Sequence, residues 1–276
     1  MTPPIVIPLD GSEHALVALP VAKRLAEIEG ATLHLVHVAR KISPPEKILE
    51  RLGISGADLR GSVLDTKAGE SASGIIQEAS ELKAAFIVMC THTTIAATEK
   101  TVGHTALAVL KGAPCPVVLV RPERGVMPWP LRRILLPHDG TPITSALIHP
   151  ATALARRSAA ALDVLHVAAP GGRPPTESGS LTTPRYIDQP QHEWPTWVHE
   201  FLERLACICP LESLKIRMSL APGVPGEEVL RFAGEHGSDL IVLAWHGEWE
   251  GEHAATLKAV LGHAAAFPAM VIRTGT

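Results

Sequence analysis

Short runs of apolar residues alternate with longer amphipathic stretches along this chain, and the whole pattern occurs twice. The segment Ile5–Ser12 is an apolar run that ends in a polar turn, and Ile134–Thr141 has the same pattern 129 positions later (134 minus 5). The next apolar run, Leu33–Ala39, matches Leu162–Ala168 at the same offset (162 minus 33). Self-similarity at a fixed spacing indicates a duplicated unit, so we expect two related domains.

The apolar runs have the length of strands, and the stretches between them have the spacing of helices. Strands that are apolar on both faces are typical of a parallel sheet covered by helices on both sides. The alternation therefore predicts an α/β fold with two repeated, doubly wound domains. We expect strands at Ile5–Leu9, Leu33–Val38, Ser62–Thr66, Phe86–Met89 and Val117–Val120, and then at Arg133–Leu136, Leu162–Val167, Lys215–Ser219, Leu240–Leu243 and Ala269–Ile272. Helices of the first repeat are expected at Glu13–Glu29, Glu46–Leu52, Ser71–Leu82 and His104–Lys111, with Ser12 as an N-cap.

The second repeat carries an insertion. Its later segments match at an offset of 154 (240 minus 86), which leaves 25 additional residues (154 minus 129). These fall in Gly171–Pro195, where prolines, glycines and serines predict a surface loop that cannot extend a helix. Two interpretations stay open: the segment folds over the crevice of the second repeat with Tyr186 or Trp194 as anchor, or Trp194 and Trp197 only pack the following helix.

A second Pro-rich segment separates the repeats. Pro122–Pro130 contains three prolines and a glycine, so we interpret it as a linker. We divide the chain into a first domain at residues 1–122, a linker at 123–131 and a second domain at 132–276. The last strand of each domain is a short apolar edge, and such edges pair with another strand to avoid aggregation. We therefore expect Val117–Val120 to pair antiparallel with Ala269–Ile272 inside one chain.

Composition excludes several classes of function. A net charge of -3 and an isoelectric point near 6.5 give no positive field for nucleic acid or an anionic membrane. No segment has the roughly 20 apolar residues of a membrane span, and the start has no basic, apolar leader, so we expect a cytoplasmic protein. The cysteines lack a zinc-binding spacing: Cys90, Cys115, Cys207 and Cys209.

Four motifs of the first repeat together resemble the universal stress protein family. They are an apolar-Pro-x-Asp-Gly-Ser turn at Ile7–Ser12, Val-His-Val at Val36–Val38, Val-Met-x-Thr-His at Val88–His92, and the segment Ala113–Val120. The resemblance covers residues 4–122 and, more weakly, 132–274. It implies five-stranded parallel sheets with strand order 3-2-1-4-5, an adenine nucleotide site where the strand order reverses, and pairing of the two domains through their last strands.

The family resemblance also gives a test for ATP binding. Members that bind ATP carry Gly-x-x-Gly, nine residues, then Gly-Ser or Gly-Thr after the fourth strand, because backbone N–H groups that hold phosphates need close approach. In the first repeat Cys90 and Thr93 replace two of these glycines and Gly103 is retained. In the second repeat the corresponding positions are Ala244, Gly247 and the pair Ala255–Thr256. The motif is therefore degenerate in both repeats.

An aspartate follows each first strand. The resemblance implies that Asp10 or Asp139 reaches the adenosine, and that the backbone of Val38 or Val167 reads the adenine edge. The alternative for both aspartates is helix capping, since Asp-Gly-Ser is also a good turn. The candidate ligand-binding residues are Pro8, Asp10, Gly11, Val38, Met89, Cys90, Thr93, Gly103, His104, Thr105, Asp139, Val167, Gly247 and Thr256.

Neither metal chemistry nor catalysis is predicted. His34 and His37 are three positions apart on one strand and so face opposite sides of the sheet, which prevents joint chelation. His37 and His166 are expected to be hydrogen-bonded core histidines. No nucleophile elbow, HExxH or Walker motif is present, so the sequence favours a protein that is not an enzyme and nominates no catalytic residues, while an enzyme stays open. Histidines near the fourth strands are left open as cation ligands: His92 with His104, and His246 with His253.

Two functions remain as alternatives. The first is a tandem stress-response module that binds or senses without catalysis, has degenerate nucleotide sites and acts on an unknown protein partner. The second is an ATP- or AMP-binding sensor that uses the first domain, with slow hydrolysis of ATP. Retained Asp10, Val38 and Gly103 favour the sensor, whereas Cys90 and Thr93 favour the module. A homodimer is left open in both cases.

Overall fold

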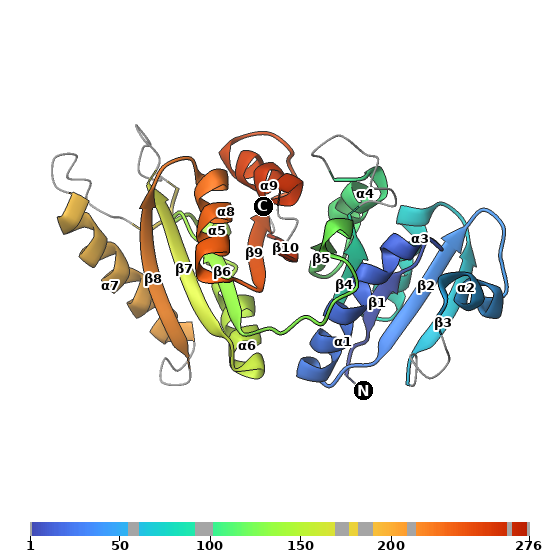
Figure 1. The fold of residues 1–276 in the computed structure, drawn as a ribbon. Coiled ribbons are helices and arrows are strands. Elements are labelled where there is room, and N and C mark those ends of the chain that lie inside the picture. Colours follow the sequence, from blue (N-terminus) through green and yellow to red (C-terminus); the bar gives the residue numbers. More distant parts are fainter. Residues whose placement is uncertain are drawn as a thin grey trace. The chain divides into compact units, whose positions relative to one another are not determined.

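A computed structural model describes residues 2–54, 61–91, 102–168, 177–181, 190–208, 214–263 and 267–274. The chain forms two compact units (Figure 1): unit 1 contains Met1–Pro130 and Leu261–Arg273, and unit 2 contains Leu131–Val260 and Thr274–Thr276. Within the described ranges, none of the helices combines the length and apolar character that crossing a bilayer requires.

The sheet of unit 1 confirms the predicted doubly wound topology. Its strands are β1 (Ile5–Pro8), β2 (Leu33–Ala39), β3 (Val63–Ala68), β4 (Phe86–Cys90) and β5 (Val117–Val120). They are parallel and lie in the order β3-β2-β1-β4-β5, so the strand order reverses between β1 and β4. Such a reversal opens a crevice at the carboxyl ends of the strands. The helices are α1 (Ala18–Glu29), α2 (Pro45–Leu52), α3 (Ser71–Glu81) and α4 (His104–Gly112).

The first predicted helix is shorter than the sequence indicated. Residues Glu13–Val17 form a 3-10 turn, η1, and the α-helix begins only at Ala18. Pro20 explains the break, because a proline removes one backbone donor and is tolerated only in the first turn of an α-helix. The helix ends as expected at Gly30, which has a left-handed backbone with φ of 62°.

Unit 2 repeats the same arrangement. Its strands β6 (Arg133–Pro137), β7 (Ala161–Ala168), β8 (Lys215–Pro222) and β9 (Leu240–Trp245) are parallel, with β6 between β7 and β9 and β8 beyond β7. The helices are α5 (Pro142–Ser145), α6 (Ile148–Ser158), α7 (Pro190–Ile208), α8 (Pro225–His236) and α9 (Glu252–His263).

Helix α7 corrects one sequence-based prediction. Gly171–Pro195 was expected to be loop throughout, but α7 begins at Pro190 and includes Pro195. A proline inside a helix costs about 3 kcal/mol. Burial of Trp197 and Phe201, which stack with centroids 5.4 Å apart, supplies an opposing gain of similar size. Tyr186 and most of the insertion fall outside the described residues.

Strand β10 (Ala269–Arg273) comes from the second repeat by sequence and belongs to unit 1 by its contacts. It runs antiparallel to β5, with Ala269 opposite Leu119 and Val271 opposite Val117. At the last residue of the strand, Nη1 of Arg273 donates a hydrogen bond to the backbone carbonyl of Lys111 at 2.9 Å. Unit 1 therefore contains a sixth strand that follows all of unit 2's strands in the sequence. A short 3-10 turn, η2 (Pro122–Arg124), follows β5.

Candidate functional site

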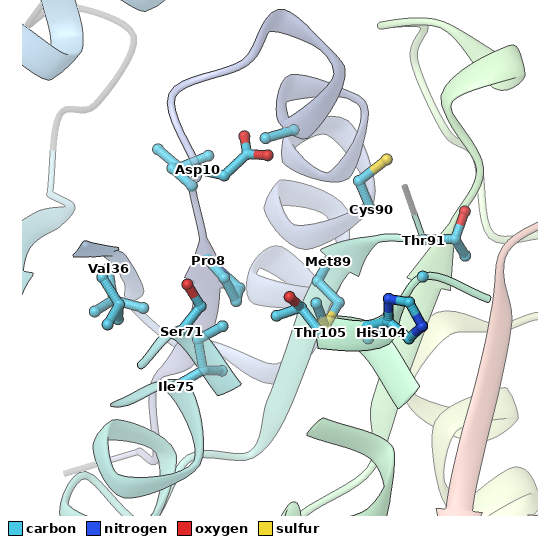
Figure 2. A pocket seen from close by; sticks show the side chains of 15 residues that line it. Pro8, Asp10, Val36, Ser71, Ile75, Met89, Cys90, Thr91, His104 and Thr105 are labelled. Carbon is cyan, nitrogen blue, oxygen red and sulfur yellow. The ribbon is translucent and has the colours of Figure 1, made fainter. Parts of the chain in front are cut away.

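A cavity of about 330 Å³ lies in unit 1 where the strand order reverses. Figure 2 shows side chains from β1, β2, β4, α3 and α4 around it. The volume is at the lower end of the range for small-molecule sites, which is about 300–1,000 Å³. The structure places eight of the sequence-predicted residues in its lining: Pro8, Asp10, Val38, Met89, Cys90, Gly103, His104 and Thr105.

Seven further lining residues were missed by sequence reasoning: Leu9, Ala15, Val36, Ser71, Ile75, Thr91 and Ala106. Ser71 and Ile75 are the most informative, because they come from the first turns of α3. Their spacing of four residues puts both on one helix face. In an open α/β sheet the helix after the edge strand returns beside the crevice, so this position could have been inferred from the fold.

The inner wall of the cavity is apolar. Val36, Ile75 and Met89 are placed around it in Figure 2, and Val38 belongs to the same lining. Helix α3 approaches this wall closely at Gly74, where an added Cβ would lie 2.7 Å from Cγ1 of Val38. Glycine is therefore needed at position 74 for the observed packing of α3 on β2.

The Asp10 turn is held by hydrogen bonds at the carboxyl end of β1. Oδ1 of Asp10 accepts from the backbone N–H and the hydroxyl of Ser12 at 2.8 and 2.7 Å. Ser12 is at the N-cap position as predicted, but its hydroxyl serves Asp10 and makes no side-chain cap. Gly11 has φ of 84°, and an added Cβ would overlap the Arg51 guanidinium from α2. The turn thus combines an exposed carboxylate with a nearby guanidinium.

Helix α4 directs its N-terminus at the cavity, with His104, Thr105 and Ala106 in the lining. The first N–H groups of a helix have no intrahelical acceptor and attract anions. No side chain caps this end. At α3, by contrast, Glu70 accepts from the N–H groups of Ala72 and Ser73, and these amide bonds, Ser73 first, lower the pKa of Glu70. The α4 end is therefore the better anion site of the two.

The glycine positions of the degenerate motif can be compared with the structure in part. Gly103 is the N-cap of α4 with φ of -59°, a conformation open to any residue, and its N–H donates to the Thr91 carbonyl at 3.0 Å. Cys90 ends β4 and is half-buried in the cavity wall. Thr93 and His92 lie outside the described residues.

In unit 2 the carboxylate of the equivalent turn accepts hydrogen bonds from residues that closely follow it in the sequence. Oδ1 of Asp139 accepts from the N–H and hydroxyl of Thr141 and from the hydroxyl of Thr144, at 2.9, 2.7 and 2.7 Å. Gly140 has φ of 89°, and Leu181 donates its N–H to the Gly140 carbonyl at 2.7 Å. An added Cβ at Gly140 would meet Leu181 at 3.3 Å and Nε1 of Trp197 at 3.5 Å. Leu181 of the insertion and Trp197 of α7 thus cover this turn.

Aromatic side chains of α7 pack against two histidines, one that follows β6 and one on β7. Trp197 lies against the rings of His138 and His166, with centroids 5.7 and 4.8 Å away, and Phe201 lies 5.0 Å from His138. Trp197 and Phe201 are both buried. Two buried residues anchor this part of the chain, Leu181 from the insertion and Trp197 from α7. Trp194, one of the two anchors expected from the sequence, stacks on Trp197 with ring centroids 5.4 Å apart.

His138 is held neutral in this cluster. It is fully enclosed, and burial lowers its pKa to about 3, an effect that Asp139 partly opposes. Nδ1 of His138 accepts the N–H of Gly140 at 3.0 Å. The residue at the same place in the first repeat is Leu9 (138 minus 129), so both repeats put an uncharged side chain here.

The remaining candidates of unit 2 come from three separate segments. Val167 lies near the end of β7, paired with Ala221 of β8. Gly247 follows β9 with φ of 98°, and Trp245 Nε1 donates to the Glu248 carbonyl at 2.8 Å to close this loop. Thr256 lies inside α9, where its backbone is 3.7 Å from a Cβ added at Gly226 of α8.

Comparisons with known proteins give a consistent result. The model of the universal stress protein family matches residues 1–60, 46–121 and 130–273. A universal stress protein of Thermus aquaticus, encoded in the QAH/OAS sulfhydrylase 3' region, is 33% identical over 135 residues, which are 42% of this chain and 97% of that protein.

Solved structures agree in fold over nearly the whole chain. A functionally unknown protein from Pseudomonas aeruginosa PAO1 has a TM-score of 0.69 at 16% identity, covering 99% of this chain and 92% of that one. A universal stress protein from Archaeoglobus fulgidus has a TM-score of 0.61 at 16% identity, covering 98% and 96%. The duplicated sequence, the 3-2-1-4-5 sheet and the matched segments together show that this chain belongs to the universal stress protein family as a tandem member.

Proposed function

We propose that this chain is a non-catalytic stress-response sensor that binds one adenine nucleotide, in unit 1 only. The observation that carries the proposal is a contrast between the repeats. Unit 1 has a cavity at the reversal of strand order, whereas the corresponding turn of unit 2 is covered by Trp197 and Leu181.

The chemistry of the unit 1 cavity suits the three parts of a nucleotide. The apolar wall of Val36, Val38 and Ile75 fits the faces of a base, and Val38 is the last residue but one of β2. Asp10 offers a carboxylate to the ribose hydroxyls, and the N-terminus of α4 offers backbone donors to a phosphate. Different protein groups would bind the base, the ribose and the phosphate, so replacing one group should weaken affinity and leave the other two contacts in place.

The replaced glycines argue for weak binding. Cys90 and Thr93 put side chains where a close triphosphate cradle needs bare backbone. We therefore expect AMP to be held at least as well as ATP. The double variant Cys90→Gly with Thr93→Gly should raise the affinity for ATP relative to AMP, which titration calorimetry measures; an unchanged ratio would remove this steric account.

Calorimetric titration of the full chain with AMP and ATP tests the proposal. Asp10→Asn keeps an oxygen acceptor for Ser12 but loses the charge, and it should weaken binding at least tenfold, about 1.4 kcal/mol. The matched control is Asp139→Asn in unit 2, which should leave affinity unchanged. Equal losses in both variants, or no heat with either nucleotide, would contradict the proposal.

A second function follows if nucleotide does not bind. Both repeats depart from the ATP motif, so the chain would then act as a module whose signal passes only through a protein partner. We place it in the cytoplasm in either case. Native mass spectrometry of the freshly purified protein separates the two: a retained mass of one adenine nucleotide favours the sensor, and its absence together with silent calorimetry favours the module.

A further inference from the structure

Three ligand-type side chains from three elements converge at the outer edge of the unit 1 sheet, away from the cavity lining. His34 lies on β2, Asp65 on β3 and Glu78 on α3. Nε2 of His34 is 2.8 Å from Oε1 of Glu78 and 3.1 Å from Oδ2 of Asp65. One imidazole nitrogen and two carboxylate oxygens all lie within 4.8 Å of one another.

The contacts of His34 are not hydrogen bonds. Its side chain is only 9% exposed, and Nε2 lies close to two carboxylate oxygens without making a hydrogen bond to either. A buried polar nitrogen is expensive to leave unsatisfied. A metal ion bound between the three ligand atoms would give this nitrogen a partner.

Charge in this corner favours a further cation. Glu78 is 4% exposed, and Asp65 and Glu81 add two more carboxylates. Lys67 contacts Glu78 through Oε2 and Glu81 at 3.1 Å, so the four groups carry a net charge of -2 (three negative, one positive). A divalent ion on Oε1 of Glu78 would neutralise this charge while Lys67 keeps Oε2.

The second repeat provides an internal comparison. The position equivalent to His34 is Asp163 (34 plus 129), also buried on a second strand. Asp163 is met by two cations of the protein itself, Arg133 Nη1 at 3.0 Å and Arg217 Nε at 3.5 Å. Unit 2 therefore supplies its own positive charge at this corner, and unit 1 presents an excess of negative charge instead.

We propose that His34, Asp65 and Glu78 bind one divalent transition-metal ion, with Zn²⁺ as the best match. Bonds of about 2.0–2.2 Å in tetrahedral geometry separate ligand atoms by roughly 3.3–3.6 Å. The His34–Asp65 contact of 3.1 Å approaches this separation, and the His34–Glu78 contact of 2.8 Å would open by about 0.5 Å around the ion. The imidazole argues against Mg²⁺ and Ca²⁺, which take oxygen ligands. Asp65 is 51% exposed, so water can reach the cluster to supply a fourth ligand.

The site joins α3 to both outer strands. Glu78 is three residues beyond Ile75 on the same helix, so the ion would fix the helix whose first turns line the cavity. The proposal stands on the edge cluster alone and does not require a nucleotide in unit 1.

Titration of the metal-free full chain with Zn²⁺, and absorption of its Co²⁺ form, tests the site. The chain has 14 histidines, so the readout is one binding equivalent and its change between variants. Asp65→Asn is exposed and should fold normally while weakening that equivalent at least tenfold. Glu81→Gln removes a neighbouring carboxylate that is not a ligand and should retain it. Lys67→Met removes a competing cation and should bind more tightly.

The outcomes divide cleanly. Zn²⁺ binding lost in Asp65→Asn and kept in Glu81→Gln, with a visible Co²⁺ band of a four-coordinate site, supports the proposal. The absence of an equivalent tighter than about 100 μM in the wild type overturns it. Equal binding in wild type and Asp65→Asn, or equal loss in Asp65→Asn and Glu81→Gln, overturns it as well.

Discussion

Nδ1 of His37 donates a hydrogen bond to the carbonyl oxygen of Leu9 at 2.6 Å, across the carboxyl ends of β2 and β1. The donor must be the ring nitrogen, because a carbonyl can only accept. The same bond joins His166 to the carbonyl of His138 in unit 2, at 2.9 Å. Each histidine holds the residue that immediately precedes the turn aspartate. Both are thus hydrogen-bonded histidines of the sheet, which agrees with the sequence interpretation.

Replacing His37 should disturb the cavity without touching the ligand chemistry. His37→Leu leaves the Leu9 carbonyl without its donor, and an unsatisfied buried acceptor costs about 1–3 kcal/mol. We expect a lower free energy of unfolding and weaker AMP binding, measured by urea unfolding and calorimetry. His166→Leu is the matched control: it should destabilise the chain by a similar amount and leave AMP affinity unchanged. Equal effects of both variants on affinity would contradict this role.

Gly74 should be required for the close packing of α3 on β2. Gly74→Ala places a Cβ 2.7 Å from Val38 Cγ1, so either α3 or the Val38 side chain must move, which changes the cavity wall. Alanine normally stabilises a helix interior by up to about 1 kcal/mol over glycine. We expect the overlap to cancel this gain and AMP affinity to fall.

Gly234 in α8 supplies the control, because nothing lies within 4 Å of its added Cβ. Gly234→Ala should raise the thermal midpoint and leave affinity unaltered. A stabilised Gly74→Ala with normal affinity would show that the glycine is not needed for packing.

His138 should make the stability of unit 2 depend on pH. Burial depresses its pKa from 6.5 to about 3, so the folded state excludes a proton that the unfolded state accepts. Stability is therefore complete above about pH 6.5 and falls as the pH drops towards 3. In that window the slope approaches about 1.4 kcal/mol per pH unit.

Urea unfolding at pH 7, 6 and 5, followed by tryptophan fluorescence, measures this slope. His138→Leu, which installs the residue of the first repeat, should flatten it, although loss of the acceptor for Gly140 lowers stability at pH 7. An identical slope in wild type and variant would assign the pH dependence to other groups.

Trp197 should carry much of the packing in unit 2. Truncation to alanine removes its contacts with His138, His166 and Phe201, and large aromatic truncations in a core cost about 3–5 kcal/mol. Trp249 is half-buried near Lys258, so Trp249→Ala should cost distinctly less. Thermal unfolding compares the two variants, and similar losses would contradict the assigned packing.

The sequence predicted the inner strands well because their apolar residues are buried on both faces, as in Ile5–Pro8 and Val117–Val120. The outer strands β3 and β8 are partly exposed, and both extend beyond their predicted ends. The sequence anticipated a helix after the insertion but not its start at Pro190, since the prolines that argued for a loop are outweighed by burial of Trp197 and Phe201. The family resemblance and the position of strand ends together gave the cavity residues that adjoin those ends, such as Asp10 and Met89. The contribution of α3 was missed because it depends on how a helix crosses the sheet, which is a tertiary property.

Strand β10 has a consequence for synthesis of the chain. Its partner β5 ends at Val120 and β10 begins at Ala269, 149 positions later (269 minus 120). At about 5–20 residues per second, a ribosome needs roughly 7–30 s to synthesise that length of chain. During this interval the outer edge of β5 is without β10, and an unpaired apolar edge is a template for association with other chains. The nascent protein is therefore exposed to misassembly for longest at β5, whose edge is covered only when β10, the last strand, has been made.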